Sequence, residues 1–103
     1  MIVIRIQHTV PSFEKWKHAF DADPMDRKAS GVRSYRVFRS VEDPNVVMVD
    51  LEFDSRAAAD AMFDRLGQLW AGPGAAVMMS AAAMIVEAVE SVTIAPTDAS
   101  SSK

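Results

Sequence analysis

The chain contains no cysteine, which excludes disulfides, thiolate metal sites and cysteine nucleophiles. No apolar run is long enough to span a bilayer, because the nearest candidate, residues 75–89, is interrupted by Ser80 and Glu87. A glycine-rich phosphate loop, a metal-ligand spacing and a serine–histidine–acid pattern are also absent. The formal net charge of -3 gives no reason to expect nucleic acid or an acidic membrane as a partner. The first residues include Arg5 and no small-residue cleavage site, so we expect no signal peptide and predict a cytoplasmic protein.

Two segments alternate apolar and other residues in the manner of β-strands. In residues 46–53 the odd positions are all apolar, whereas the even positions end in Asp50 and Glu52. Residues 2–9 behave alike, with isoleucine at positions 2, 4 and 6 and Arg5 on the other face. A sheet with one apolar face and one mixed, charge-bearing face has something packed on both sides. This pattern predicts helices on one side and a partner subunit or a lined cavity on the other.

A first helix is indicated by apolar residues at helical spacing. Phe13, Trp16 and Phe20 share one face. Ser12 is a suitable N-cap, and Pro24 disfavours helical geometry in the residue before it. The sequence therefore predicts a helix that begins after Ser12 and ends near residue 23.

The remaining segments complete a chain of six elements. Turn-forming residues 42–45 predict a hairpin, and the glycines and proline at 72–74 end a second helix that begins after Asp54 or Ser55. The alanine- and methionine-rich residues 75–82 fit either a short helix or a packed loop. The predicted elements after the first helix are a strand at 32–41, a strand at 46–53, a helix with the buried stripe Ala59, Met62, Phe63, Leu66 and Leu69 or Trp70, and a strand at 84–94.

The resulting order, β-α-β-β-α-β, predicts a ferredoxin-like α+β fold: a four-stranded antiparallel sheet with two helices on one face. In the strand order 4-1-3-2 the first and third strands are central, and their apolar rows lie under the helices. No internal repeat or linker is visible, so residues 1–94 are expected to form one domain. The polar, small residues 95–103 are expected to form a disordered tail.

Several short motifs fall at characteristic places in this pattern. They are His8 at the end of the first strand, Phe13-Glu14-Lys15-Trp16-Lys17, Gly31-Val32-Arg33-Ser34-Tyr35-Arg36-Val37, Asp43-Pro44-Asn45, and Leu51-Glu52-Phe53 before an alanine-rich helix. In these residues, and in pattern over nearly all of residues 1–94, the chain resembles the dimeric α+β barrel superfamily. That superfamily includes antibiotic-biosynthesis-monooxygenase-like proteins and small polyketide cyclases. The resemblance implies a homodimer whose two sheets pack face to face, with ligands between sheet and helices or within the barrel.

The resemblance carries over no catalytic set. Haem-degrading members use a histidine on the second helix or the loop after it, whereas the histidines here are His8 and His18. Anthrone-oxidising members use an asparagine and a tryptophan near the second helix. Trp70 matches the tryptophan, but the only asparagine, Asn45, lies in a predicted turn.

The strongest candidate for a functional cluster is the group of charged residues Arg5, Asp50, Glu52 and Glu87. In the predicted strand order, Arg5 lies between the strands that bear the carboxylates. Asp50 and Glu52 share its face, and Glu87 joins them if the last strand keeps the matching register. A partly buried carboxylate there would have a raised pKa and could act as a general base on an acidic carbon or phenol. The alternative is a paired charge network at a dimer interface, because an unpaired buried charge is costly.

Two single residues each have a functional and a structural interpretation. His8 ends a strand and could serve as a proton shuttle near a cavity mouth, as a histidine in the first strand resembles what some cyclase-like relatives carry. It could equally be a hydrogen-bonded histidine at a strand end. Tyr35, the only tyrosine, could orient a phenolic ligand from the edge strand, or simply be a β-forming residue on a half-buried surface.

Two larger groups have similar alternatives. Trp16 and Trp70, with Phe20, Met62 and Phe63, either line an aromatic ligand pocket or pack in the core. Five basic residues with no acidic residue between them either attract a carboxylate or phosphate, or protect an edge strand from aggregation. These basic residues are Arg27, Lys28, Arg33, Arg36 and Arg39.

Two functions fit these observations. In the first, a homodimer acts without a cofactor on a small aromatic or polyketide-like molecule, by oxygenation or cyclisation. Asp50, Glu52 or His8 would then be the base, and Arg5 would stabilise an enolate or phenolate. In the second, a non-catalytic dimer binds a small apolar ligand or a protein partner.

Overall fold

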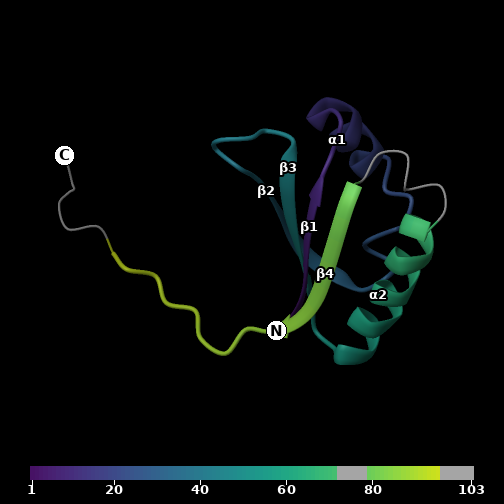
Figure 1. The fold of residues 1–103 in the computed structure, drawn as a ribbon. Coiled ribbons are helices and arrows are strands. Elements are labelled where there is room, and N and C mark those ends of the chain that lie inside the picture. The colour runs from purple at the N-terminus through teal and green to yellow at the C-terminus, as the bar shows by residue number, and fades with distance from the viewer. Residues whose placement is uncertain (72–78, 96–103) are drawn as a thin grey trace.

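The structure, a computed structural model, describes residues 1–71 and 79–95. The elements are β1 (Ile2–Thr9), α1 (Phe13–Asp21), β2 (Val32–Arg39), β3 (Val46–Phe53), α2 (Arg56–Ala71) and β4 (Met79–Glu87). The strands form one antiparallel sheet in the order β2-β3-β1-β4. Both helices lie on the same side of this sheet (Figure 1). The predicted ferredoxin-like α+β fold, with β1 and β3 as the central pair, is confirmed.

The register of the two central strands fixes the two faces of the sheet. Ile4 pairs with Leu51 and Arg5 pairs with Asp50, so the apolar rows and the charged rows fall on opposite faces. The apolar rows of both strands are almost completely buried under the helices. The core comprises Ile4, Ile6, Val10, Trp16, Val47, Val49, Leu51, Phe53, Ala59, Met62 and Leu66. The face toward the helices is called the covered face below, and the other is called the open face.

Both helices begin at a serine cap. The Ser12 hydroxyl accepts a hydrogen bond from the backbone nitrogen of Lys15 at 3.3 Å, as predicted. The Ser55 hydroxyl accepts one from the nitrogen of Ala58 at 3.1 Å, which selects Ser55 over Asp54 as the second cap. The predicted helix end at residues 72–74 lies outside the described residues.

The last strand differs from its prediction at both ends. It begins at Met79, so the predicted short helix or loop at 75–82 is wrong for residues 79–82, where pairing with β1 continues as far as Thr9. It ends at Glu87 rather than at residue 94, because Glu87 pairs with Ile2 and the nitrogen of Ala88 bonds the carbonyl of Met1 at 3.0 Å. Residues 88–95 extend from the sheet with their side chains exposed (Figure 1).

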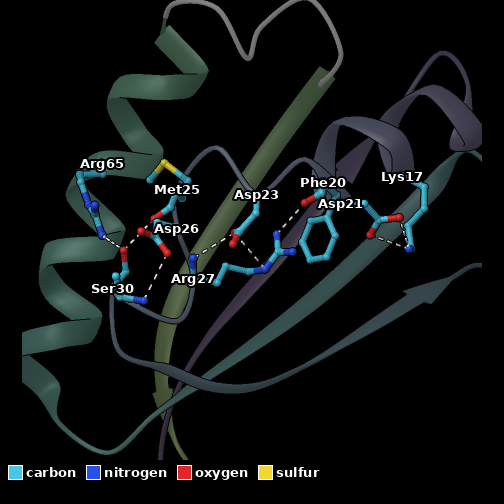
Figure 2. A network of polar contacts seen from close by, with 10 residues as sticks. Lys17, Phe20, Asp21, Asp23, Met25, Asp26, Arg27, Ser30 and Arg65 are labelled. Atoms are coloured by element: carbon cyan, nitrogen blue, oxygen red, sulfur yellow. Dashed lines mark hydrogen bonds and ion pairs between the residues drawn. The ribbon is translucent and has the colours of Figure 1, made fainter.

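The segment between α1 and β2 is tied to both helices (Figure 2). Arg65 of α2 donates a hydrogen bond to the Ser30 hydroxyl, which itself donates to the carbonyl of Met25 at 2.7 Å. Gly31 has φ 94°, and a Cβ added there would lie 3.1 Å from the Cβ of Ala58. The segment is therefore held close against α2.

Within residues 1–71 and 79–95, no helix is long and apolar enough to cross a membrane. Except for Ala95, the predicted disordered tail lies outside the described residues.

Candidate functional site

A cavity of about 340 Å³ lies between the covered face of the sheet and the two helices. Its lining is almost entirely apolar, and Pro24 and Met25 close part of it from the segment after α1. Aromatic and aliphatic side chains of this kind are typical of small-molecule sites. The sheet contributes Ile6, His8, Val49 and Leu51, α1 contributes Trp16, Ala19 and Phe20, and α2 contributes Met62, Leu66, Leu69 and Trp70.

His8 is the exceptional residue in this lining. The alternation of β1 places it in the row of Ile2, Ile4 and Ile6, so it points under the helices and is only 2% exposed. Neither ring nitrogen has a hydrogen-bond partner within residues 1–71 and 79–95. The interpretation as a hydrogen-bonded strand-end histidine is therefore wrong. Buried polar groups are usually paired, so an unpaired one in a cavity calls for a partner from outside the chain.

Burial lowers the pKa of His8 from its ordinary value of 6.5 to about 4. At neutral pH the ring is therefore uncharged, with one nitrogen able to accept a hydrogen bond or a proton and the other able to donate. No salt bridge among the described residues involves His8. The side chain can act as a base only if the resulting cation gains a negative partner in the cavity.

A row of aromatic rings leads from His8 to the edge of the sheet. The ring of His8 lies 5.2 Å from that of Trp16, which stacks on Phe20 at 5.0 Å. Phe20 in turn meets Tyr35 edge to face at 5.2 Å. Trp16 is a buried core residue that also forms a wall of the cavity, so its position fits both the pocket and the core interpretation.

Tyr35 and Trp70 have different positions. Trp70 is partly buried and lines the cavity. Tyr35 lies on the edge strand and lines a separate surface hollow, together with Asp23, Arg27 and Arg33. Tyr35 is 44% exposed, and its ring meets the cavity-lining residues Phe20 and Arg27 from outside.

On the open face, the predicted meeting of Arg5 and Asp50 is confirmed. Nε of Arg5 donates to Oδ1 of Asp50 at 2.9 Å, and Nη2 donates to Oδ2 at 2.8 Å. The Asp50 side chain is 5% exposed, whereas that of Arg5 is 52% exposed. The hydrogen bonds from Arg5, assisted by the charges of Arg5 and Arg36 and opposed by burial, lower the pKa of Asp50. The predicted raised pKa is therefore wrong for Asp50, since its ionised form is the stabilised one.

The other two carboxylates do not join this pair. Glu52 lies on the open face beside Val3 and accepts a hydrogen bond from the Ser34 hydroxyl at 2.7 Å. Glu87 pairs with Ile2, and its neighbour Ile85 packs on the core, so the register places Glu87 on the covered side of the sheet. The conditional prediction that Glu87 faces Arg5 is wrong, because Met84 is the residue of β4 opposite Arg5.

The sequence contained part of the signal for the cavity. Position 8 continues the even-numbered row of β1, which predicts that His8 faces the helices. Whether His8 has a hydrogen-bond partner and space beside it depends on the distance between the helices and the sheet. The hydrophobic periodicity of the sequence does not determine that distance. Among the described residues, no group of three histidine, aspartate or glutamate side chains could hold a metal ion.

Comparison with known proteins places this geometry in a structural context. No family model and no curated protein matches the chain. Solved structures do match. SnoaB from Streptomyces nogalater, a cofactor-independent oxygenase solved as a point mutant, has 13% identity and a TM-score of 0.72 over 88% of this chain and 95% of its own. A point mutant of MhuD, with two manganese protoporphyrin IX molecules per active site, has 17% identity and a TM-score of 0.67 over 90% of this chain and 99% of its own.

A dimeric ferredoxin-like protein from an uncultured marine organism also matches, with 14% identity and a TM-score of 0.60 over 88% of this chain and 97% of its own. The matches further include an antibiotic biosynthesis monooxygenase. At these identities the likeness concerns the fold. The chain thus shares its fold with SnoaB, MhuD and this antibiotic biosynthesis monooxygenase, as the resemblance of its motifs implied.

Proposed function

We propose that this protein binds a small aromatic molecule in the cavity under its helices and oxygenates it with His8 as the base. The observation that carries the proposal is the neutral imidazole of His8, without a partner among the described residues, on the wall of an apolar, ring-lined cavity. The similarity in fold to SnoaB, a cofactor-independent oxygenase, supports the reaction class.

The chemistry requires a substrate with an acidic C–H or O–H group. A ring nitrogen of His8 accepts that proton, which leaves a delocalised carbanion or phenolate beside the new imidazolium. The two charges stabilise each other in the apolar cavity and offset the low basicity of His8. The anion then supplies the electrons that reduce molecular oxygen. For a CH2 group flanked by two aromatic rings, the overall reaction converts CH2 and O2 into a ketone and water.

The two sets of predicted bases lie on opposite faces of the sheet. His8 faces the cavity, whereas Asp50 is ionised, paired with Arg5 and separated from the cavity by the sheet. The proposal therefore assigns the base to His8 and a structural role to Asp50, Arg5 and Glu52. A cyclisation would use the same base, but it would consume no oxygen.

Anthrone, a tricyclic carbon acid with such a CH2 group, is a suitable probe. We expect the wild-type protein to accelerate oxygen uptake and anthraquinone formation above the buffer background. His8→Gln should lower the rate at least about 100-fold, the low end of the contribution of a general base. Asp50→Asn is the matched control and should retain most of the rate. Loss of activity in Asp50→Asn with retention in His8→Gln would assign the base to the open face instead.

A non-catalytic ligand-binding protein is the second candidate. The observation that favours it is that His8 and Arg27 are the only ionisable residues among the described cavity lining. A second acid or base to return the proton is therefore missing from that part of the chain. Anthrone binding, detected by calorimetry, without oxygen uptake would establish this function in place of the first.

We further propose that a second copy of the chain covers the open face. Phe38 is 43% exposed and Met84 is 59% exposed, and their strand partners Met48 and Arg5 place both on this face. Exposed apolar side chains of this size on one sheet face are typical of an interface. The dimeric ferredoxin-like neighbour supports the same arrangement.

Light scattering after size exclusion tests the dimer. We expect twice the chain mass of 11.3 kDa for the wild type and a shift toward the monomer in Met84→Asp. Val41→Asp, at a fully exposed turn position, is the matched control and should leave the mass unchanged. A monomeric wild type at micromolar concentration would refute the dimer.

A further inference from the structure

Arg27 lies where the cavity meets the protein surface. It is among the residues that line the cavity, and it also lines the surface hollow beside Lys28, Arg33 and Tyr35. Its side chain is only 15% exposed, which is low for an arginine. Of the five residues of the predicted basic stretch, Arg27 is the one that reaches the cavity.

The guanidinium of Arg27 is held in a fixed orientation (Figure 2). Its Nη1 donates to the carbonyl of Phe20 at 2.8 Å, and its Nε lies 3.4 Å from Oδ1 of Asp23. Its carbon atom lies 3.9 Å from the centre of the Phe20 ring and 4.9 Å from that of Tyr35. Two rings and two oxygen atoms therefore restrain the group from several directions, so it loses little freedom on binding a ligand.

The positive charge of Arg27 is only partly compensated. The Asp23 carboxylate accepts a hydrogen bond from the backbone nitrogen of Arg27 at 2.9 Å, and its Oδ1 lies at the longer distance of 3.4 Å from Nε of the guanidinium. No hydrogen bond involves Nη2 among the described residues. A cation with free donors at the edge of an apolar cavity attracts an anionic group, most strongly a planar carboxylate.

We propose that the ligand of the cavity is an aromatic acid, whose carboxylate binds Arg27 at the mouth while its rings lie inside against Trp16 and Phe20. This inference rests on the proposed ligand site and adds the chemical class of the ligand. Because a cavity of about 150 Å³ holds benzene, a volume of about 340 Å³ suits a fused bicyclic ring system with a substituent. The acid at Arg27 leaves the far end of the ring system for His8.

The test compares 2-naphthoate with its neutral isostere, 2-naphthamide, by titration calorimetry. We expect the wild type to bind the acid about ten- to 100-fold more tightly, the usual range for a charge-assisted hydrogen bond. Arg27→Gln should remove this preference and leave naphthamide binding unchanged. Lys28→Gln removes the same charge from the surface hollow, outside the cavity, and should retain the preference. Arg27→Lys provides a second variant that keeps the charge, with an intermediate preference, and circular dichroism checks the fold of each.

The outcomes separate this inference from the proposed function. Equal binding of acid and amide by the wild type overturns the role of Arg27 and leaves the cavity as a ligand site. A preference that survives in Arg27→Gln also overturns it, because another group would then recognise the acid. Binding of neither compound overturns the ligand site and this inference together.

Discussion

The two faces of the sheet each bury an ionisable group, but the group on the open face is paired and charged, whereas the one on the covered face is neutral. On the open face, Arg5 and Asp50 satisfy each other through two hydrogen bonds, and the pKa of Asp50 is lowered. On the covered face, His8 is as buried as Asp50 but has no hydrogen-bond partner in the part of the chain that the structure describes. Its pKa is lowered because burial disfavours the charged form. A paired ion stabilises the fold and is a weak base, whereas an unpaired neutral group remains free to act on a ligand.

The largest expected effect on stability comes from breaking the pair on the open face. Arg5→Met leaves the Asp50 carboxylate buried without a partner, so we expect a loss of about 2–3 kcal/mol in the free energy of unfolding. The value is below that of a fully buried pair because half of the Arg5 side chain is exposed. Urea denaturation at one fixed protein concentration measures it.

The double variant Arg5→Met, Asp50→Leu is the control for this experiment. It replaces both charges with apolar groups and should regain most of the lost stability. If Arg5→Met alone is as stable as the wild type, the pair contributes nothing, and the contrast between the two faces fails.

The next largest effect is the loss of stability at low pH, which occurs in a different pH range for His8 on the covered face than for Asp50 on the open face. The pKa of His8 is about 4 in the folded protein and 6.5 when unperturbed, so the unfolded chain binds the proton first. Its contribution to stability is complete above pH 6.5 and is lost as the pH falls toward 4. Between about pH 7 and about pH 5 the expected loss is about 2 kcal/mol. Asp50 has a lowered folded pKa, so its contribution is lost only as the pH falls below its ordinary 3.8.

Urea denaturation at about pH 7 and about pH 5 measures this loss. His8→Met removes the titrating group, so the difference in unfolding free energy between the two pH values should be about 2 kcal/mol smaller than in the wild type. An unaltered pH dependence in His8→Met would show that the ring is not held neutral by burial.

The alternation of side chains along the strands predicted most of the fold and half of the candidate cluster. Because side chains in a strand alternate between faces, the positions of Arg5 and Asp50 predicted that both lie on the open face. Their direct pairing then followed from the register of the central strands. That register is well determined, because a shift by one residue would move the apolar row of a strand from the covered face to the open face.

Glu87 and the cavity could not be predicted in the same way. Residues 75–84 are mostly alanine and methionine without clear periodicity, so neither the start of β4 nor its register could be read from them. The cavity depends on the distance between Trp16, Met62 and the sheet, and a helical stripe looks the same whether it fills that space or borders it.

A change on the cavity wall should affect ligand binding more than stability. Ala19 lines the cavity from α1, and Ala19→Leu places a larger apolar side chain in the space that the ligand would occupy. We expect 2-naphthoate binding to weaken at least about tenfold, while the free energy of unfolding changes by less than about 1 kcal/mol. Ala22→Leu, at the exposed end of α1, should affect neither property. Undiminished binding in Ala19→Leu would place the ligand elsewhere.

The smallest effect is expected at Glu52, the carboxylate of the open face that is not paired with an arginine. Its hydrogen bond to the Ser34 hydroxyl is exposed, and the amide oxygen of Glu52→Gln can still accept it. We therefore expect a change of less than about 0.5 kcal/mol in unfolding free energy and no change in anthrone turnover. Parallel urea and oxygen-uptake measurements check both. A loss of turnover at constant stability would mean that the open face takes part in the chemistry, and the division of roles between the two faces would be wrong.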